Sequence, residues 1–189
     1  PVVQDVISRF GNGWNVWYGA TETVAGVFLL KEDWAGQGPS SSRLTSIGRG
    51  GPFLEVDVLS DTGEPVPRDG ASVGEIVCRG DSVSRGYYRD AEGTRSAFRD
   101  GWYCTGDLGS IDEDGFIFLA GRKKDLIISG AMNIYPKEIE DLLHSHQAVD
   151  ICSVVGVPHP KWGETPKAFV RLRSGHSVTE EELISFCGA

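Results

Sequence analysis

Apolar residues in the first two thirds of the chain recur in short runs separated by turn residues. Residues 24–30 form an apolar run of strand length, and a polar connection rich in glycine, proline and serine follows over residues 34–42. Residues 54–58 alternate between apolar and acidic side chains, the period-2 pattern of a half-buried strand, and residues 75–79 form another short strand. Strands with turns at this spacing predict a small β-barrel or sandwich rather than a βαβ layer.

The clearest turn signal lies in the segment 112–115. Its Asp-Gly pair lies between the segments 109–111 and 116–119, which predicts a β-hairpin.

The pattern changes after Gly121. A strand is expected over residues 126–129, and Pro136 is placed to begin a helix whose apolar stripe is Ile139, Leu142 and Leu143. Because two styles of pattern meet at residues 121–124, we expect a domain boundary there.

Two strands and a helix are expected after this first helix. The strands cover residues 151–157 and 168–172. Thr179 and Glu182 form a capping box, which predicts a helix carrying Leu183, Ile184 and Phe186. The fold class expected for the whole chain is therefore α+β.

Composition narrows the function classes. The chain has 189 residues and a net charge of −9, which argues against nucleic acids and anionic membrane surfaces because both require a concentrated basic patch. No apolar stretch approaches the roughly 20 residues of a membrane span, and the first residues lack the pattern of a signal peptide. We expect a cytoplasmic protein.

The side chains that most often bind metals are scattered. The four cysteines, Cys78, Cys104, Cys152 and Cys187, include no Cys-x-x-Cys pair and predict reduced, mostly buried thiols. His144 and His146 are two residues apart, so their rings would lie on different faces of a helix; we expect a solvated helix end rather than a metal pair.

Candidate chemistry begins at residues 18–22, Tyr-Gly-Ala-Thr-Glu. Gly19 lets the backbone approach a ligand, and the other side chains suit a nucleotide: the Tyr18 ring can stack on a base, the Thr21 hydroxyl can meet a phosphate, and the Glu22 carboxylate can hold Mg²⁺. An ordinary strand-to-loop turn is the alternative interpretation of the same pentapeptide.

A second candidate is Thr105-Gly106-Asp107, which follows Gly101-Trp102-Tyr103. An aspartate in this setting is often only a turn former, but the two oxygens of a carboxylate also match the vicinal hydroxyls of a ribose.

The third candidate is the run from Gly121 to Gly130, which contains Arg122, Lys123, Lys124 and Asp125 before an apolar strand. The planar, permanently charged guanidinium of Arg122 suits ribose and phosphate oxygens.

Together the three motifs resemble those of the adenylate-forming superfamily, in particular its acyl-CoA synthetases, over nearly the whole chain. The resemblance implies that Tyr18, Gly19, Ala20 and Thr21 bind ATP or AMP and that Glu22 binds Mg²⁺. It implies that Asp107 and Arg122 contact the nucleotide, and that Lys124 is the hinge of a small mobile domain. Thr21, Glu22 and Lys124 are thereby the expected catalytic residues.

The resemblance extends to the wall of the CoA pantetheine tunnel, at Gly130 and Ala131. Many acyl-CoA synthetases read Ser-Gly-Gly-Glu-Asn here, so Ala131 departs from the second glycine and Met132 from the glutamate. The added methyl group puts the efficiency of thioester formation in doubt.

Two of the superfamily's elements are missing: the upstream phosphate loop that ends in a lysine, and a terminal lysine expected beyond Ala189. The resemblance therefore assigns residues 1–121 to the C-terminal part of the large AMP-binding domain, including its small β-barrel. Residues 122–189 would be the small α+β mobile domain, truncated before its lysine motif. We expect the isolated chain to be inactive.

The function implied is part of an ATP-dependent, AMP-forming acyl-CoA synthetase, a ligase that uses a carboxylic acid, ATP, Mg²⁺ and CoA. The alternatives are an acyl-carrier-protein ligase and a non-catalytic module that binds a nucleotide or a partner. The sequence does not distinguish a fatty, an aryl or an alicyclic acid, and a homo-oligomer is possible.

Overall fold

The computed structural model describes residue 6 and residues 9–11, 15–24, 26–34 and 42–188. The chain divides into two compact units, residues 1–119 and 120–189, and each is described by itself. The expected polar connection over residues 34–42 lies almost entirely outside the described residues.

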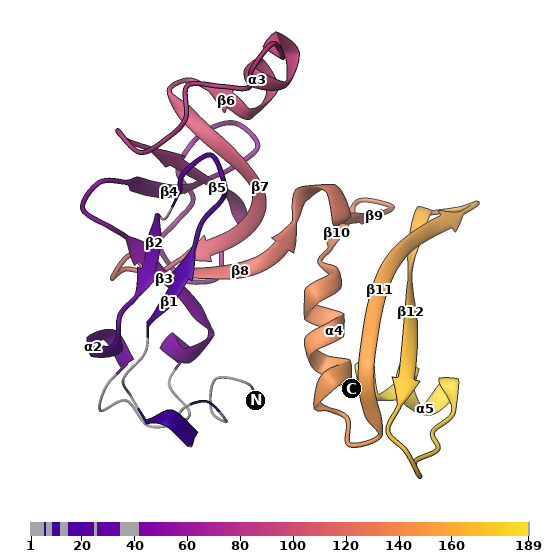
Figure 1. The fold of residues 1–189 in the computed structure, drawn as a ribbon. Coiled ribbons are helices and arrows are strands. Elements are labelled where there is room, and N and C mark those ends of the chain that lie inside the picture. The colour runs from indigo at the N-terminus through magenta and orange to yellow at the C-terminus, as the bar shows by residue number, and fades with distance from the viewer. Residues whose placement is uncertain (1–5, 7–8, 12–14, 25, 35–41, 189) are drawn as a thin grey trace. The chain divides into compact units, whose positions relative to one another are not determined.

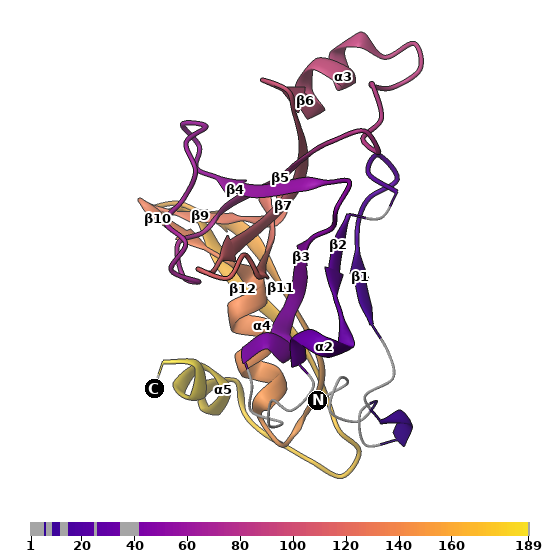
Figure 2. The same ribbon diagram turned by 90° about the vertical axis from the view of Figure 1, so that its left-hand side faces the viewer.

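The first unit is built around one sheet of eight strands (Figure 1). Its elements are β1 (Val16–Tyr18), β2 (Val27–Leu29), α2 (Lys31–Trp34), η1 (Ser42–Thr45), β3 (Ser46–Gly50), β4 (Glu55–Leu59), β5 (Gly74–Arg79), α3 (Ala91–Ala97), β6 (Phe98–Arg99), β7 (Trp102–Ile111) and β8 (Ile117–Arg122). The strand order is β1-β2-β3-β8-β7-β5-β4, with β6 paired to β7. In Figure 2, β1, β2 and β3 lie side by side.

The strand predictions for this unit hold with shorter or longer bounds. The run 24–30 yields only β2, because Val24 has a positive φ of 64° and belongs to the preceding turn. The alternating segment 54–58 forms β4, with Val58 fully buried. The Asp-Gly hairpin is confirmed: Gly115 has φ 84°, and its N–H donates to the Asp112 carbonyl at 3.0 Å.

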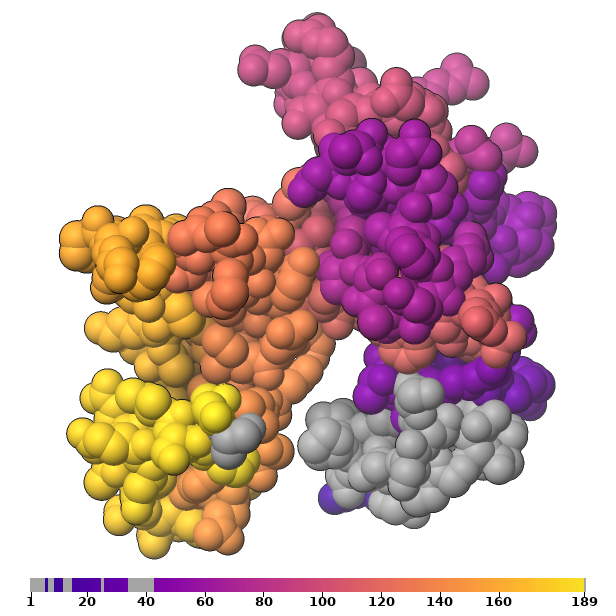
Figure 3. Space-filling view, turned by 180° about the vertical axis from the view of Figure 1, so that it is seen from behind, coloured from indigo at the N-terminus to yellow at the C-terminus, as the bar shows by residue number. Residues whose placement is uncertain are grey.

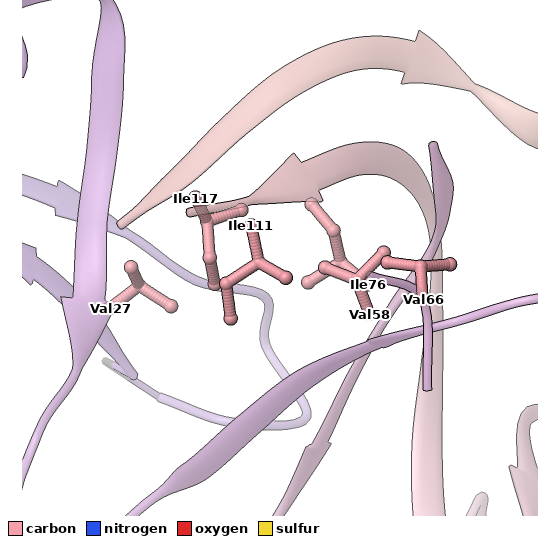
Figure 4. Close-up of a cluster of buried hydrophobic side chains, with 6 residues drawn as sticks. All are labelled: Val27, Val58, Val66, Ile76, Ile111 and Ile117. Carbon is pink, nitrogen blue, oxygen red and sulfur yellow. The ribbon is translucent and has the colours of Figure 1, made fainter. Parts of the chain in front are cut away.

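Apolar side chains from five strands and one connecting segment form the core of the first unit. The cluster comprises Val27, Val58, Val66, Ile76, Ile111 and Ile117, and Figure 4 shows these side chains gathered between the strands. Each buried aliphatic side chain of this kind contributes roughly 1.5–3 kcal/mol. The core therefore depends on strands that are far apart in sequence.

The second unit is a four-stranded antiparallel sheet with two helices. Its elements are η2 (Lys123–Asp125), β9 (Ile127–Ser129), β10 (Met132–Ile134), α4 (Pro136–Ser145), β11 (Val149–His159), β12 (Gly163–Leu172) and α5 (Glu180–Cys187), in the strand order β10-β9-β12-β11. In the space-filling view these residues, orange to yellow, form a continuous body (Figure 3). With antiparallel sheets and little helix, the α+β class is confirmed.

Both expected helices of the second unit are present. Pro136 occupies the start of α4, and Leu143 is buried against β11. The capping box of α5 is complete: Thr179 Oγ1 accepts from the Glu182 N–H at 3.2 Å, and Glu182 Oε2 accepts from the Thr179 N–H at 2.8 Å. The two late strands are longer than expected because they form one hairpin, which pairs Val149 through His159 with β12.

Two expectations for α4 need correction. Leu142 is 38% exposed, since only Ile139 and Leu143 of the expected stripe face the sheet. The end of α4 is not fully solvated either: the half-buried His146 ring packs edge-on against Phe186, with ring centroids 5.0 Å apart.

All four cysteines are free thiols, of which Cys78 and Cys152 are buried and the other two half-buried. Among the described residues, the helices are all too short or too polar to cross a membrane.

Candidate functional site

The first two sequence motifs meet in the first unit. Tyr18 lies at the end of β1 and Asp107 lies in β7, and the Tyr18 hydroxyl donates to Asp107 Oδ2 at 2.6 Å. The two strands are four steps apart in the sheet order. In a flat sheet about 4.8 Å per step would separate them by about 19 Å. The sheet must therefore curl until β1 approaches β7.

A β-bulge directs Asp107 out of the regular ladder. Val77 pairs with Cys104 and Glu75 pairs with Leu108, so the single residue Ile76 faces residues 105–107 of β7. Bulges of this kind re-aim side chains and occur next to active sites. Gly106 supplies the positive φ of 74° that the bulge uses.

Side-chain hydrogen bonds satisfy the backbone groups that the bulge leaves without ladder partners. The Thr105 hydroxyl donates to the Ile76 carbonyl at 2.7 Å and accepts from the Asp107 N–H at 3.0 Å. Glu75 Oε1 accepts from the Gly106 N–H at 3.2 Å. Thr105 within the motif and Glu75 in β5 thus hold the bulge together.

The turn after β1 is held by Thr23, which is buried. Its hydroxyl accepts from the Ala20 N–H at 3.1 Å and donates to the Ala20 carbonyl at 3.2 Å. Ala20 packs beside Tyr103 and Cys78. Within the expected nucleotide motif, this turn leaves Gly19 and Thr21 exposed and Glu22 half-buried.

Glu22 is held by a segment that is distant in sequence. The Tyr87 hydroxyl donates to Glu22 Oε1 at 2.6 Å, and the Ser84 N–H donates to the Glu22 carbonyl at 2.7 Å. The pKa of the Glu22 carboxyl group is lowered, and the hydrogen bond from Tyr87 is the largest cause.

Burial and carboxylates keep two tyrosines of this region protonated. The pKa of Tyr18 is raised well above its usual value, first by burial and then by the hydrogen bond to Asp107. The pKa of Tyr103 is raised by burial and then by the nearby Glu22 carboxylate. Both phenols therefore stay protonated at neutral pH, and Tyr18 donates its proton to the hydrogen bond with Asp107.

The Glu22 carboxylate is compatible with Mg²⁺ binding. This ion usually takes one or two protein carboxylates and completes its shell with water and phosphate oxygens. The described residues include no cluster of three or more His, Cys, Asp or Glu side chains suited to a metal, so a metal here would need the oxygens of a bound phosphate.

The third motif lies in the second unit, which also contains residues 120–122 at the end of β8. Arg122 ends β8 and Lys124 lies in the short helix η2; both side chains are exposed. A cavity of about 640 Å³ adjoins them and is lined by ionisable side chains, among them Arg122, Lys124, Lys137, Glu140, Asp141, His144 and Glu164.

Gly130 and Ala131 form the two-residue turn between β9 and β10, since Ser129 pairs with Met132. Gly130 has φ 63°, whereas Ala131 is not among the residues with positive φ, which matches a type II′ turn with glycine in first place. The Gly130 N–H donates to the Trp162 carbonyl at 2.7 Å, tying this turn to the start of β12. Ala131 is exposed and its φ is not positive, so its methyl group strains no backbone here.

Sequence reasoning missed three residues that hold the site together: Thr23, Glu75 and Tyr87. The buried Thr23 immediately follows a recognised motif, so the pentapeptide could have been extended by one residue. Glu75 and Tyr87 act across 31 and 65 residues respectively, and no local pattern indicates such pairs.

Comparison with known proteins gives two family matches. Residues 1–88 match the model of the AMP-binding enzyme, and residues 138–189 match that of the AMP-binding enzyme C-terminal domain. The 2-succinylbenzoate–CoA ligase of Geobacillus kaustophilus is 41% identical over 173 residues, which are 90% of this chain and 33% of that protein.

Solved structures agree with the sequence matches. The amide bond synthetase McbA of Marinactinospora thermotolerans is similar with a TM-score of 0.83 and 35% identity, over 97% of this chain and 37% of that one. The o-succinylbenzoate CoA synthetase MenE of Bacillus subtilis, in complex with AMP, gives a TM-score of 0.81 and 32% identity, over 100% and 36%. The chain spans about a third of the length of the curated relatives that it matches.

Proposed function

The chain belongs to the AMP-binding enzyme family, and we propose that it is part of an ATP-dependent, AMP-forming acid–thiol ligase. The intact protein would activate a carboxylic acid as an acyl-adenylate and transfer the acyl group to CoA. Residues 1–121 would be the end of the large AMP-binding domain, and residues 122–189 would belong to the small mobile domain.

The observation that carries this proposal is the hydrogen bond from Tyr18 to Asp107. It brings the aromatic ring of the first motif beside the carboxylate of the second, although 89 residues separate them. A ring for the base and a carboxylate for the ribose hydroxyls are what an adenosine requires side by side. A turn former alone would need no such partner.

The other nucleotide contacts follow from the same arrangement. Thr21 is exposed next to Glu22 and would meet a phosphate, and Glu22 would hold Mg²⁺, which neutralises phosphate charge and polarises the phosphorus–oxygen bonds. Arg122, at the end of β8, would contact ribose and phosphate oxygens.

The proposed reaction has two steps. In the first, a carboxylate oxygen of the acid attacks the α-phosphorus of ATP; a new phosphorus–oxygen bond forms and pyrophosphate leaves. In the second, the CoA thiol loses its proton and attacks the acyl carbon; a thioester forms and AMP leaves. Adenylation makes the acyl carbon electrophilic, which a free carboxylate is not.

The second unit would serve the second step. Lys124 would act as the hinge, because a charged side chain on an exposed short helix remains solvated in more than one orientation. The turn at Gly130 and Ala131 would border the path of the pantetheine arm. Ala131 adds one methyl group at this turn without distorting it, so the turn itself would keep the backbone shape that a glycine allows.

A second candidate differs only in the acceptor. The similarity to an amide bond synthetase favours an amine in place of CoA, and an acyl-carrier-protein thiol is a further alternative acceptor. A non-catalytic nucleotide-binding module is the remaining alternative.

Calorimetric titration of AMP into this chain tests the proposal. We expect saturable binding that Asp107→Ala abolishes, while Tyr18→Phe, which keeps the ring and the carboxylate, weakens it by less than about tenfold. Loss of binding in Tyr18→Phe with retention in Asp107→Ala would contradict the assigned roles. Acyl-CoA formation by the isolated chain would contradict the expectation that the terminal lysine is required.

A further inference from the structure

Glu22 is held at two points by the segment that precedes α3. The Tyr87 hydroxyl binds one of its carboxylate oxygens at 2.6 Å, and the Ser84 N–H binds its backbone carbonyl at 2.7 Å. Both the side chain and the main chain of Glu22 are therefore restrained by residues outside the pentapeptide of residues 18–22.

Tyr87 is itself fixed in place. Its N–H donates to Thr94 Oγ1 at 2.9 Å, and its ring packs edge-on against Phe98 with centroids 5.9 Å apart. Phe98 in turn contacts the buried Tyr103 ring, at 5.2 Å between centroids. The Tyr87 ring thus packs against an aromatic cluster whose other members, Phe98 and Tyr103, lie in β6 and β7.

The backbone conformation at Gly86, just before Tyr87, suits only glycine. Gly86 has φ 139°, and a Cβ at this position would lie 2.5 Å from Thr94 Cγ2. A side chain there would both strain the backbone and displace the threonine that holds Tyr87. The segment therefore presents the tyrosine hydroxyl from one direction.

A glutamate side chain in solution samples many rotamers, and fixing it costs up to about 2 kcal/mol. A carboxylate already held by one oxygen does not incur that cost when a ligand arrives, which is the physical basis of preorganisation. Hydrogen-bond partners of metal-binding side chains typically change metal affinity 10–100-fold.

From this geometry we propose that Tyr87, braced by Phe98 and Tyr103, is a positioning residue that holds the Glu22 carboxylate ready for a magnesium–nucleotide complex. The inference rests on the proposed function for the identity of the ligand. The role of Tyr87 itself rests only on contacts within the first unit.

The positioning role can be measured without any ligand. Side-chain scalar couplings of Glu22 in the labelled chain report its rotamers. We expect one dominant rotamer in the wild type and averaged couplings in Tyr87→Phe, which removes only the hydroxyl. Tyr88→Phe is the matched control, because the neighbouring Tyr88 is 86% exposed. Unchanged Glu22 couplings in Tyr87→Phe would overturn the inference.

The consequence for binding is tested by titrating ATP with and without Mg²⁺. We expect Tyr87→Phe to weaken binding in the presence of Mg²⁺ by 10–100-fold and to leave metal-free binding within about twofold. In a Glu22→Gln background the substitution should have little further effect, because the two residues act as a pair.

The outcomes separate the two proposals. An equal loss with and without Mg²⁺, or an undiminished loss in the Glu22→Gln background, would show a general structural role and overturn the inference. If wild-type protein binds ATP with no dependence on Mg²⁺, the assignment of Mg²⁺ in the proposed function is wrong. The side-chain couplings of Glu22 still decide the role of Tyr87.

Discussion

The carboxylate of Glu75 accepts a hydrogen bond from the Gly106 N–H at 3.2 Å, in the middle of the bulge that presents Asp107. Its other oxygen accepts from Arg99 at 3.1 Å. The side chain is about 10% exposed, so one nearly buried acid stabilises the backbone beneath the candidate ribose site.

Replacing this acid should loosen the bulge. We expect Glu75→Leu to lower the free energy of unfolding by about 1–3 kcal/mol, because the Gly106 N–H loses its acceptor in a poorly solvated place. Glu75→Gln, which retains an acceptor oxygen, should lose less. Urea denaturation of the two variants measures the difference; equal losses would mean that charge, not the Gly106 contact, is what matters.

Alkaline pH should destabilise the first unit through its protected tyrosines. The pKa values of Tyr18 and Tyr103 are raised in the folded chain, so the unfolded chain releases these protons first as the pH rises. Their contribution is complete below about pH 10, the pKa of an unperturbed tyrosine, and declines above it. Thermal unfolding between pH 9 and 11 should show a steeper loss of stability for the wild type than for Tyr18→Phe.

Acidic pH should lower the stability of the first unit through protonation of Asp69. The N–H groups of Ser72 and Ala71 and the Ser72 hydroxyl stabilise the ionised carboxylate and lower its pKa to about 2. Such a group contributes stability above the unfolded pKa of about 4 and loses it as the pH falls towards 2. Asp69→Asn should flatten the acid limb of a stability profile; a profile parallel to the wild type would contradict this.

The turn at Gly130 should tolerate substitution unequally. Gly130→Ala places a Cβ 3.1 Å from the Trp162 ring in a backbone region disfavoured for alanine, so we expect a loss of about 1–2 kcal/mol. Ala131→Gly should cost no more than about 1 kcal/mol, through the entropy of the unfolded chain. Thermal unfolding compares the two directly. In the intact enzyme, Ala131→Gly should increase the rate of thioester formation if that methyl group narrows the path.

Alkylation should distinguish the cysteines. Burial raises the pKa of the Cys78 thiol to about 12, so almost no thiolate is present at pH 8 and reaction requires opening of the core. Mass spectrometry after brief iodoacetamide treatment should find Cys78 unmodified in the native chain. Rapid labelling of Cys78 would show that its strand opens more readily than the structure implies.

Local signals predicted the elements well where a few neighbouring residues decide the conformation. The Asp-Gly pair at residues 114–115 fixed a hairpin, and Thr179 with Glu182 fixed the start of α5, because turn and cap energetics act over three or four residues. The prediction that Leu142 faces the sheet was wrong, because helical period alone does not say which residue at the edge of an apolar stripe is buried.

The candidate site was predictable in its parts but not in its assembly. Tyr18, Glu22 and Asp107 were recognised from short motifs, and the structure joins the first to the third. Their roles towards a nucleotide stay predictions. Glu75 and Tyr87 could not be foreseen, because their importance arises from the curl of the sheet and the path of a distant segment.

The curl of the sheet that brings β1 to β7 also has a consequence for the order in which contacts form during folding. Ribosomes deliver residues 16–24 long before Asp107, so early chains hold half of the candidate nucleotide site without its complement. Contacts of such large sequence separation form late in folding, since a long loop must close first. AMP should therefore bind only chains that have completed the first unit, which makes the nucleotide a reporter of finished folding.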